Sequence, residues 1–122
     1  MKPKPSTRFQ TDHLPARMMK ERRWVVWKPV ERDGKWTKVP VDPVTRENAR
    51  SNDPATWGTF EQACHCADMY DLGLGFMLGD GWLGVDFDHV AEDRRIVDRW
   101  ISQWAADTTA YVEYSPSGTG IH

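Results

Sequence analysis

The stretch from Trp82 to His89 places the tightest limit on how this chain folds, because its apolar and acidic residues alternate. With the two-residue period of a β-strand, its apolar side chains share one face: Leu83, Val85 and Phe87. Asp86 and Asp88 then lie side by side on the opposite face. Two neighbouring carboxylates repel each other, so a divalent cation such as Mg²⁺ would stabilise the pair. The alternative is a solvated acidic turn in which Asp88 caps the following helix, and the D-x-D spacing fits both.

Length and hydrophobic content indicate one domain. The chain has 122 residues, of which 39% are hydrophobic, enough for a single modest core. No apolar run approaches the length of a membrane span, and the first residues lack the apolar segment of a signal peptide. We therefore expect a cytoplasmic protein that contacts no membrane. Cys64 and Cys66 lie two apart on an expected helix, where their side chains diverge, so we expect reduced thiols.

Charge is unevenly distributed along the chain, although the net charge is only −2. Residues 1–23 carry seven Lys and Arg against Asp12 and Glu21, a balance of +5, so the remainder balances at −7. We interpret residues 1–22 as a basic, flexible arm and residues 23–122 as the folded domain. The arm suits contact with a polyanion, but a solvating leader that contains several prolines has the same composition.

The first part of the domain has the pattern of a β-hairpin. A β-rich run predicts a strand over 24–28 that ends at Pro29, because proline cannot donate to a strand ladder. A turn over 31–34 leads to a return strand over 36–41. The polar, turn-rich residues 42–53 are predicted to form a loop.

A helix with clear start signals follows this loop. Asp53 and Pro54 begin a helical turn. Thr59 and Gln62 have the spacing of a capping box, which predicts a helix that runs to about Tyr70. Its apolar stripe is expected to face the core: Phe60, Ala63, Cys64, Ala67 and Met69 or Tyr70.

The second part of the domain continues with strands and one helix. We expect a strand over 74–78, a tight turn over 79–81, a strand over 82–87, a helix over 92–105 and a last strand over 110–115. The order ββαββαβ predicts an α+β fold, with a mostly antiparallel sheet and helices packed on it.

The C-terminal residues Ser117-Gly118-Thr119-Gly120-Ile121-His122 form a loop rich in glycine and hydroxyl groups. Glycines allow backbone N–H groups to approach an anion, and the hydroxyls and the histidine add donors, so the loop suits a triphosphate. An ordinary flexible turn has the same pattern. The pairing with Asp86 and Asp88 is more specific, because metal ligands and phosphate donors together are what nucleotidyl transfer needs.

These two motifs resemble the first and second motifs of the archaeo-eukaryotic primase superfamily. They are Gly84-Val85-Asp86-Phe87-Asp88-His89 and Tyr114-Ser115-Pro116-Ser117-Gly118-Thr119-Gly120-Ile121-His122. The sequence looks most similar to the primase-polymerase domains of phages, prophages and plasmids, over residues 23–122. Upstream segments agree with the resemblance: Trp27-Lys28-Pro29, Lys38-Val39-Pro40, Asp53-Pro54-Ala55-Thr56-Trp57, Phe60 and Gly73-Leu74-Gly75-Phe76.

The resemblance implies an RRM-like catalytic core and Mg²⁺- or Mn²⁺-dependent primer synthesis or extension on a single-stranded DNA template, with a helicase fused or recruited. It implies that Asp86 and Asp88 bind the metals. It assigns the phosphates of the incoming nucleoside triphosphate to His122, with help from Ser117, Gly118, Thr119 and Gly120, and Lys38 as an additional contact.

The same resemblance implies a third acidic motif further along the chain than His122. We therefore expect an N-terminal portion of a primase-polymerase domain whose activity needs the C-terminal portion. Glu113, on the same strand face as Ser115, is a candidate substitute. Two other functions stay open: a non-catalytic primase-like protein of a mobile element that binds or inhibits a protein or nucleic-acid partner, and a single-stranded DNA binder that uses the arm and exposed tryptophans.

Overall fold

The computed structural model describes residue 2 and residues 14–92, 95–108, 110–115 and 118–122. Most of the arm and Ser117 lie outside the described residues. In chain order the elements are α1 (Ala16–Lys20), β1 (Trp24–Arg32), β2 (Lys35–Val41), a 3-10 turn (Pro54–Thr56), α2 (Phe60–Tyr70), β3 (Gly73–Phe76), β4 (Ala91–Glu92), β5 (Arg95–Ile96) and α3 (Arg99–Asp107). The fold is α+β with antiparallel sheets, as predicted.

The main sheet has the strand order β2-β1-β3 and is antiparallel throughout. The predicted hairpin is confirmed, but β1 does not end at Pro29 and continues to Arg32. β3 pairs only with residues Trp24 to Trp27 of β1. Beyond Trp27 one edge of β1 therefore has no partner strand in this sheet. Pro29, which has no N–H group to donate, is tolerated in this part of β1.

Helix α2 begins at the predicted capping box. The Thr59 hydroxyl accepts from the Gln62 N–H at 3.2 Å, and the Gln62 side chain accepts from the Thr59 N–H at 2.9 Å. The predicted stripe is partly wrong, since Cys66 is buried where Cys64 was expected and both Met69 and Tyr70 are exposed. Both thiols are free, as expected.

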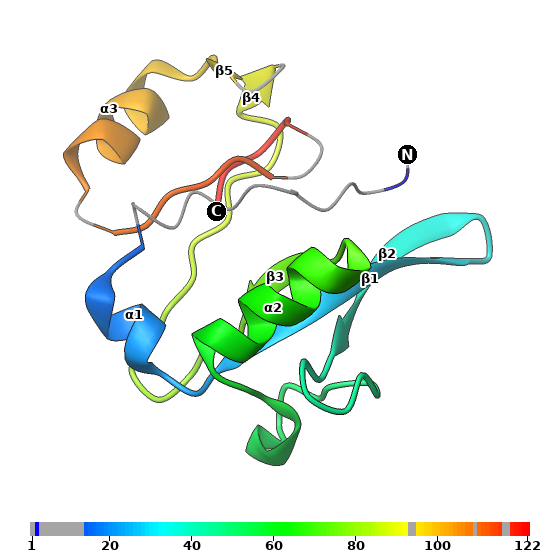
Figure 1. Cartoon of the computed structure of the whole chain (residues 1–122). Helices are drawn as coiled ribbons and strands as arrows, with labels where there is room; N and C mark the ends of the chain where they lie inside the picture. The colour runs from blue at the N-terminus through cyan, green and yellow to red at the C-terminus, as the bar shows by residue number, and fades with distance from the viewer. Residues whose placement is uncertain (1, 3–13, 93–94, 109, 116–117) are drawn as a thin grey trace.

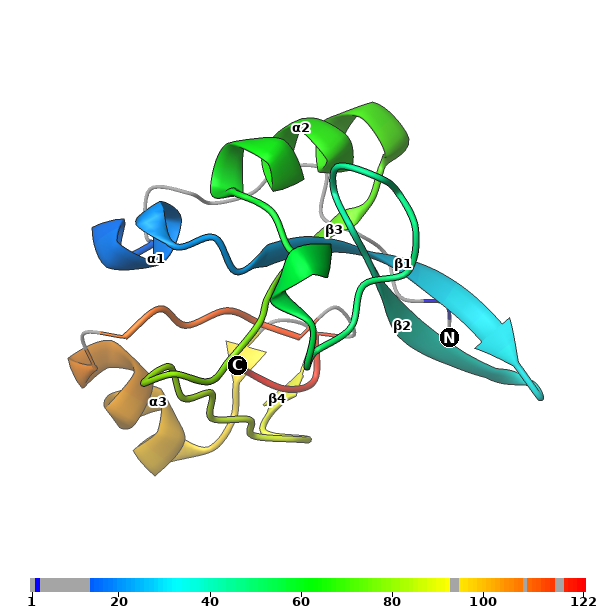
Figure 2. The same cartoon turned by 90° about the horizontal axis from the view of Figure 1, so that it is seen from below.

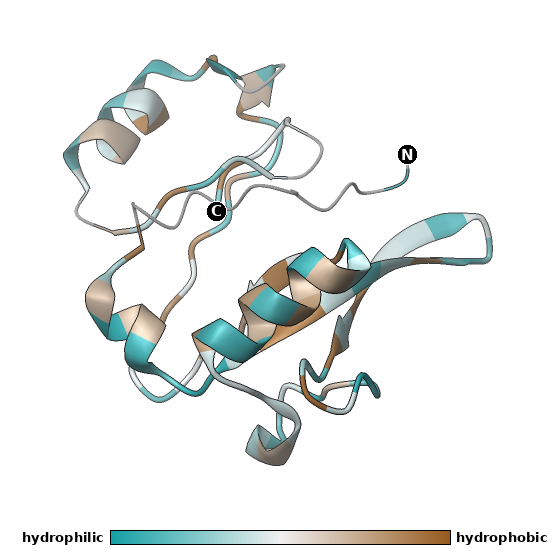
Figure 3. Cartoon of the chain, viewed as in Figure 1, coloured by the Kyte–Doolittle hydropathy of each residue, from teal (hydrophilic) through white to brown (hydrophobic). Residues whose placement is uncertain are grey.

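The core forms where α2 covers one face of the sheet. Its buried members are Trp24, Val26, Val41, Ala63, Cys66 and Ala67. Figure 3 shows that β1 and β3 are strongly hydrophobic behind α2. Figures 1 and 2 show the C-terminal segment on the other face of the sheet, with α3, β4 and β5 at one end of the molecule.

Three predictions for the second part of the chain are wrong. Residues 82–87 do not form a continuous strand, because only Trp82 and Phe87 make isolated bridges, and Leu83 is 88% exposed. Residues 110–115 likewise contribute a single bridge, at Tyr114, among those described. The second helix begins at Arg99 and not near residue 92, where β4 pairs with β5 instead.

A buried arginine ties the start of β1 to the turn after β3. Arg23 donates to the Met77 and Leu78 carbonyls at 2.6 and 2.9 Å and to the Asp80 carboxylate at 2.8 Å. Its guanidinium lies 4.7 Å from the centre of the Trp57 ring. These contacts fix the start of the segment that carries the two aspartates. Within the described residues no helix combines the length and the apolar character needed to cross a bilayer.

Candidate metal and phosphate site

A narrow three-segment ladder carries the candidate site. Phe87 and Ile121 exchange two backbone hydrogen bonds of 3.0 Å, and Glu113 and His122 exchange two of 2.9 and 2.8 Å. The segment that ends at His122 therefore lies between the Asp86–Asp88 segment and the Glu113–Ser115 segment. Because neighbours across an antiparallel ladder share a face, Asp86, His122 and Glu113 form a row.

His122 is held between two carboxylates in this row. Its Nδ1 lies 3.2 Å from Glu113 Oε1, and its Nε2 lies 3.6 Å from Asp86 Oδ1. The hydrogen bond with Glu113 raises the pKa of His122, although partial burial opposes the shift. The site therefore favours an imidazole that carries a positive charge beside Asp86.

Glu113 is itself held by two donors. Burial opposes its ionisation, but the hydrogen bonds from His122 and from the Tyr111 hydroxyl, the latter at 3.0 Å, lower the pKa of the Glu113 carboxyl overall. Burial, together with the Glu113 charge, raises the pKa of Tyr111. The carboxylate of Glu113 is thus engaged with both His122 and Tyr111, although its side chain is still 48% exposed.

Asp86 and Asp88 flank Phe87, whose side chain points to the other face. There the Phe87 ring packs edge-on against Trp100 and Trp104 of α3, with centroid distances of 5.8 and 5.4 Å. Both aspartates are exposed on the face away from this packing. The predicted alternation of Phe87 against the two acids is therefore present, even though the strand around it is short.

The alternative role of Asp88 as a helix cap is wrong. Asp98 caps α3, and its carboxylate accepts from the Trp100 and Ile101 N–H groups at 3.2 and 3.4 Å. Asp86 and Asp88 are hard oxygen donors of the kind that Mg²⁺ and Mn²⁺ prefer, so the donor chemistry fits such an ion. Among the described side chains, no group of three or more His, Cys, Asp and Glu is arranged to hold one.

Lys38 reaches the row from the main sheet. It lies on β2, on the face opposite α2, and its Nζ is 4.9 Å from the centre of the Trp27 ring. Partial burial lowers the pKa of Lys38, while the charges of Glu113 and Asp86 act in the opposite direction. The structure thus brings Lys38, Asp86 and His122 together although they are far apart in sequence.

The glycine loop has a structural role that the sequence did not predict. The Gly118 N–H donates to the Ser115 carbonyl at 2.8 Å, and the Gly120 N–H donates to the Ser115 hydroxyl at 2.9 Å. A Cβ on Gly120 would lie 2.7 Å from the Phe87 carbonyl oxygen. The amides of Gly118 and Gly120 therefore hold the ladder together, while the Thr119 side chain is exposed.

Glu113 and Tyr111 are the site residues to which the sequence assigned no definite role. Their alternation with Ser115 placed them on one strand face, and that was the available signal. Their contact with His122 depends on the ladder between distant segments, which alternation alone does not specify.

Comparisons with known proteins point in the same direction as the motifs. No protein-family model matches the chain. The chain is 39% identical over 104 residues to a DNA primase-polymerase of Nitratiruptor phage NrS-1. The match covers 82% of this chain but only 14% of the relative's length. It supports a relationship to primase-polymerases.

Proposed function

We propose that this chain is part of a primase-polymerase catalytic domain that performs template-directed, metal-dependent nucleotidyl transfer in the replication of phage, prophage or plasmid DNA. The observation that carries the proposal is the row of Asp86, His122 and Glu113, with Lys38 beside it, in a chain similar to a phage primase-polymerase. The α+β fold with antiparallel sheets is of the class that the resemblance implies.

Each residue of the row has a role that follows from its chemistry. Asp86 and Asp88 would hold Mg²⁺ or Mn²⁺, which neutralises charge on the triphosphate when bound. His122, whose pKa is raised, and Lys38 would contact the phosphates of the incoming nucleotide in their cationic forms, with Ser117 and Thr119 as hydroxyl donors. In the transfer, the primer 3′-hydroxyl forms a bond to the α-phosphorus and diphosphate leaves.

Primer extension on a single-stranded DNA template tests the proposal. The chain should be continued past His122, because the aligned region is a small part of the relative. We expect extension with Mg²⁺ or Mn²⁺, and loss of at least a hundredfold in rate when Asp86→Asn and Asp88→Asn are combined, since each lost charge removes a few kcal/mol of transition-state stabilisation. Asp68→Asn, an exposed acid on α2, is the matched control. Extension that survives the double substitution would refute the proposal.

A second candidate is a non-catalytic binding protein, and exposed apolar side chains favour it. Leu83 is 88% exposed and Trp100 is 62% exposed, and both belong to the segments around the candidate site. Such side chains are typical of protein-binding surfaces. Metal-dependent binding of a nucleoside triphosphate, measured by calorimetry, would exclude this candidate in favour of the enzyme.

A further inference from the structure

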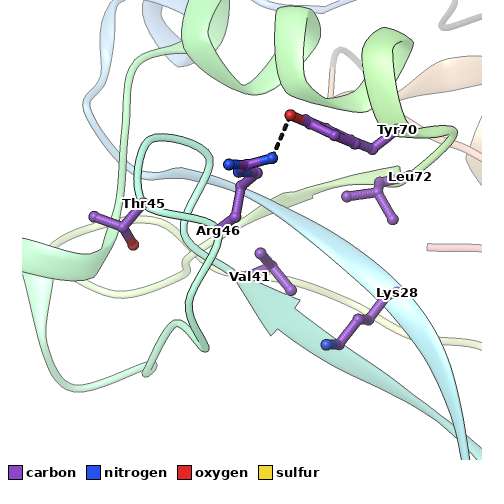
Figure 4. Close-up of a pocket in the computed structure, with 6 residues that line it drawn as sticks. All are labelled: Lys28, Val41, Thr45, Arg46, Tyr70 and Leu72. Atoms are coloured by element: carbon purple, nitrogen blue, oxygen red, sulfur yellow. Dashed lines mark hydrogen bonds between the residues drawn. The ribbon is translucent and has the colours of Figure 1, made fainter.

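A second concave site lies on the opposite face of the main sheet from Asp86 and His122. It is an open pocket of about 320 Å³, lined by Lys28, Val41, Thr45, Arg46, Tyr70 and Leu72 (Figure 4). Lys28 follows the buried Val26 on the face that α2 covers, whereas Lys38 lies on the other face. Lys28 belongs to the Trp27-Lys28-Pro29 segment of the resemblance, but the proposed catalytic site uses none of these six residues.

The pocket combines positive charge with an apolar floor. Lys28 and Arg46 lie on either side of Val41 and Leu72 (Figure 4). None of the six lining residues is acidic, and within the described part of the chain neither cation forms an ion pair with a carboxylate. On a chain with a net charge of −2, two cations that share a concave surface without a carboxylate partner favour an anionic ligand.

Arg46 is held in place by its surroundings. Its guanidinium lies 4.9 Å from the centre of the Tyr70 ring, and its Nη1 donates to the Tyr70 hydroxyl. Stacking and hydrogen bonding together orient the flat guanidinium, which reduces the entropy lost when it binds a phosphate. An arginine prepared in this way is suited to phosphate recognition.

The backbone at Arg46 is also unusual. Its φ of +65° lies in the left-handed region, and the other non-glycine residues with positive φ among those described are aspartates or a histidine, which adopt it more readily. The buried Asp42 maintains this conformation: its carbonyl accepts from the Arg46 N–H at 2.9 Å, and its carboxylate accepts from the Val44 and Thr45 N–H groups at 2.8 and 3.2 Å. Strain that the surrounding structure maintains is common at binding sites.

We propose that this pocket binds one nucleotide unit of a single-stranded nucleic acid. Lys28 and Arg46 contact phosphates, the Thr45 hydroxyl adds a donor, and Leu72, above the buried Val41, receives the apolar part of the sugar or base. The pocket volume is at the lower end of the range for small-ligand sites, which fits one nucleotide unit rather than a duplex. The choice of nucleic acid as ligand rests on the proposed function, but the binding requires neither Asp86 nor a metal ion.

Fluorescence anisotropy with a labelled oligo-dT and the 122-residue chain, in EDTA, tests the proposal. The variants are Lys28→Gln and Arg46→Asn, since asparagine accepts a positive φ more readily than most residues. Each lost phosphate contact should weaken binding roughly fivefold at 0.1 M salt, and the pair roughly 25-fold, because log K changes by about 0.7 per phosphate for each tenfold change in salt. The salt slope should also become shallower by about 0.7 per cation removed.

A matched control separates the pocket from general charge. Arg32→Asn and Lys35→Gln remove the same two charge types at the exposed tip of the β1–β2 hairpin. We expect less than a twofold change in this control. The proposal is overturned if the double variant Lys28→Gln with Arg46→Asn binds the oligonucleotide within twofold of the unmodified chain. It is also overturned if the control double variant loses as much affinity as the pocket double variant. Circular dichroism melting of every variant confirms that it is folded.

The source of the phosphate is tested by competition. Inorganic phosphate and dTMP should displace the oligonucleotide only at much higher concentrations than unlabelled oligo-dT. If dTMP binding depends on Lys28 and Arg46 while oligonucleotide binding does not, the pocket is a mononucleotide site and the proposal is wrong. Because this binding is measured in EDTA, it does not depend on metal-dependent transfer at Asp86 and Asp88, so failure here and failure of the catalytic proposal give different results.

Discussion

Gly120→Ala is predicted to destabilise the ladder that builds the candidate site. A Cβ at position 120 would lie 2.7 Å from the Phe87 carbonyl oxygen, closer than such atoms normally approach. That oxygen accepts the Ile121 N–H hydrogen bond, so it moves only if the ladder between the two segments moves. Forcing a methyl group into such a site costs about 1–3 kcal/mol.

The expected net effect is smaller than the clash alone. Replacing glycine by alanine reduces the entropy of the unfolded chain and gains about 0.4–1 kcal/mol. The free energy of unfolding should therefore fall by about 1–2 kcal/mol, which lowers the melting temperature by roughly 4–15 °C for a domain of this size. Urea unfolding followed by tryptophan fluorescence measures the change, since Trp100 and Trp104 pack on Phe87.

Gly84→Ala provides the control in the neighbouring segment. A Cβ there would meet Leu78 Cδ1 at 2.6 Å, but this atom is the end of a side chain that is 54% exposed and free to rotate. We expect a change within about 0.5 kcal/mol, as for most surface substitutions. If Gly120→Ala is as stable as Gly84→Ala, the reasoning that places the Phe87 backbone against Gly120 is wrong.

Three further predictions concern the rest of the fold. Arg23→Ala should lower the free energy of unfolding in urea titrations by about 2–4 kcal/mol, because two carbonyls lose a charged donor. The control Arg22→Ala, at an exposed position, should change it little. Equal losses of stability in the two variants would contradict the anchoring role of Arg23. Thr59→Ala should cost about 0.5–2 kcal/mol through loss of the α2 cap, measured in the same way. Burial raises the pKa of both thiols, so at pH 7 both should be alkylated more slowly than a free thiol and should need a higher pH to reach full reactivity. Mass spectrometry should show the buried Cys66 reacting more slowly than Cys64, and faster reaction of Cys66 would contradict its burial.

Local interactions explain which parts of the fold the sequence predicted well. The capping box of α2 involves residues three apart, and the β1–β2 hairpin is set by a tight turn at Asp33 and Gly34 between two β-rich runs. The turn after β3 is of the same kind, with Gly79 and Trp82 bonded across it. Each of these features is decided by neighbours that the sequence shows side by side.

The start of α3 shows where a local signal was outweighed. The apolar period that begins at Ile96 predicted a helix from about residue 92, yet Ile96 pairs with Ala91 in the β4–β5 hairpin. The cap at Asp98 then sets the helix start at Arg99. Helical period and strand pairing compete for the same apolar residues, and only their tertiary partners decide between them.

The sequence by itself determined the chemistry of the candidate site: two alternating carboxylates, a glycine and hydroxyl loop, and a histidine after it. Only the tertiary structure decided that Glu113 and Asp86 flank the His122 ring and that Lys38 approaches them from another sheet. It also decided that Gly120 is needed for close packing against Phe87. The physical reason is that Phe87 and Ile121 are bonded across a wide separation in the chain, and such pairings depend on the whole fold and not on any local pattern.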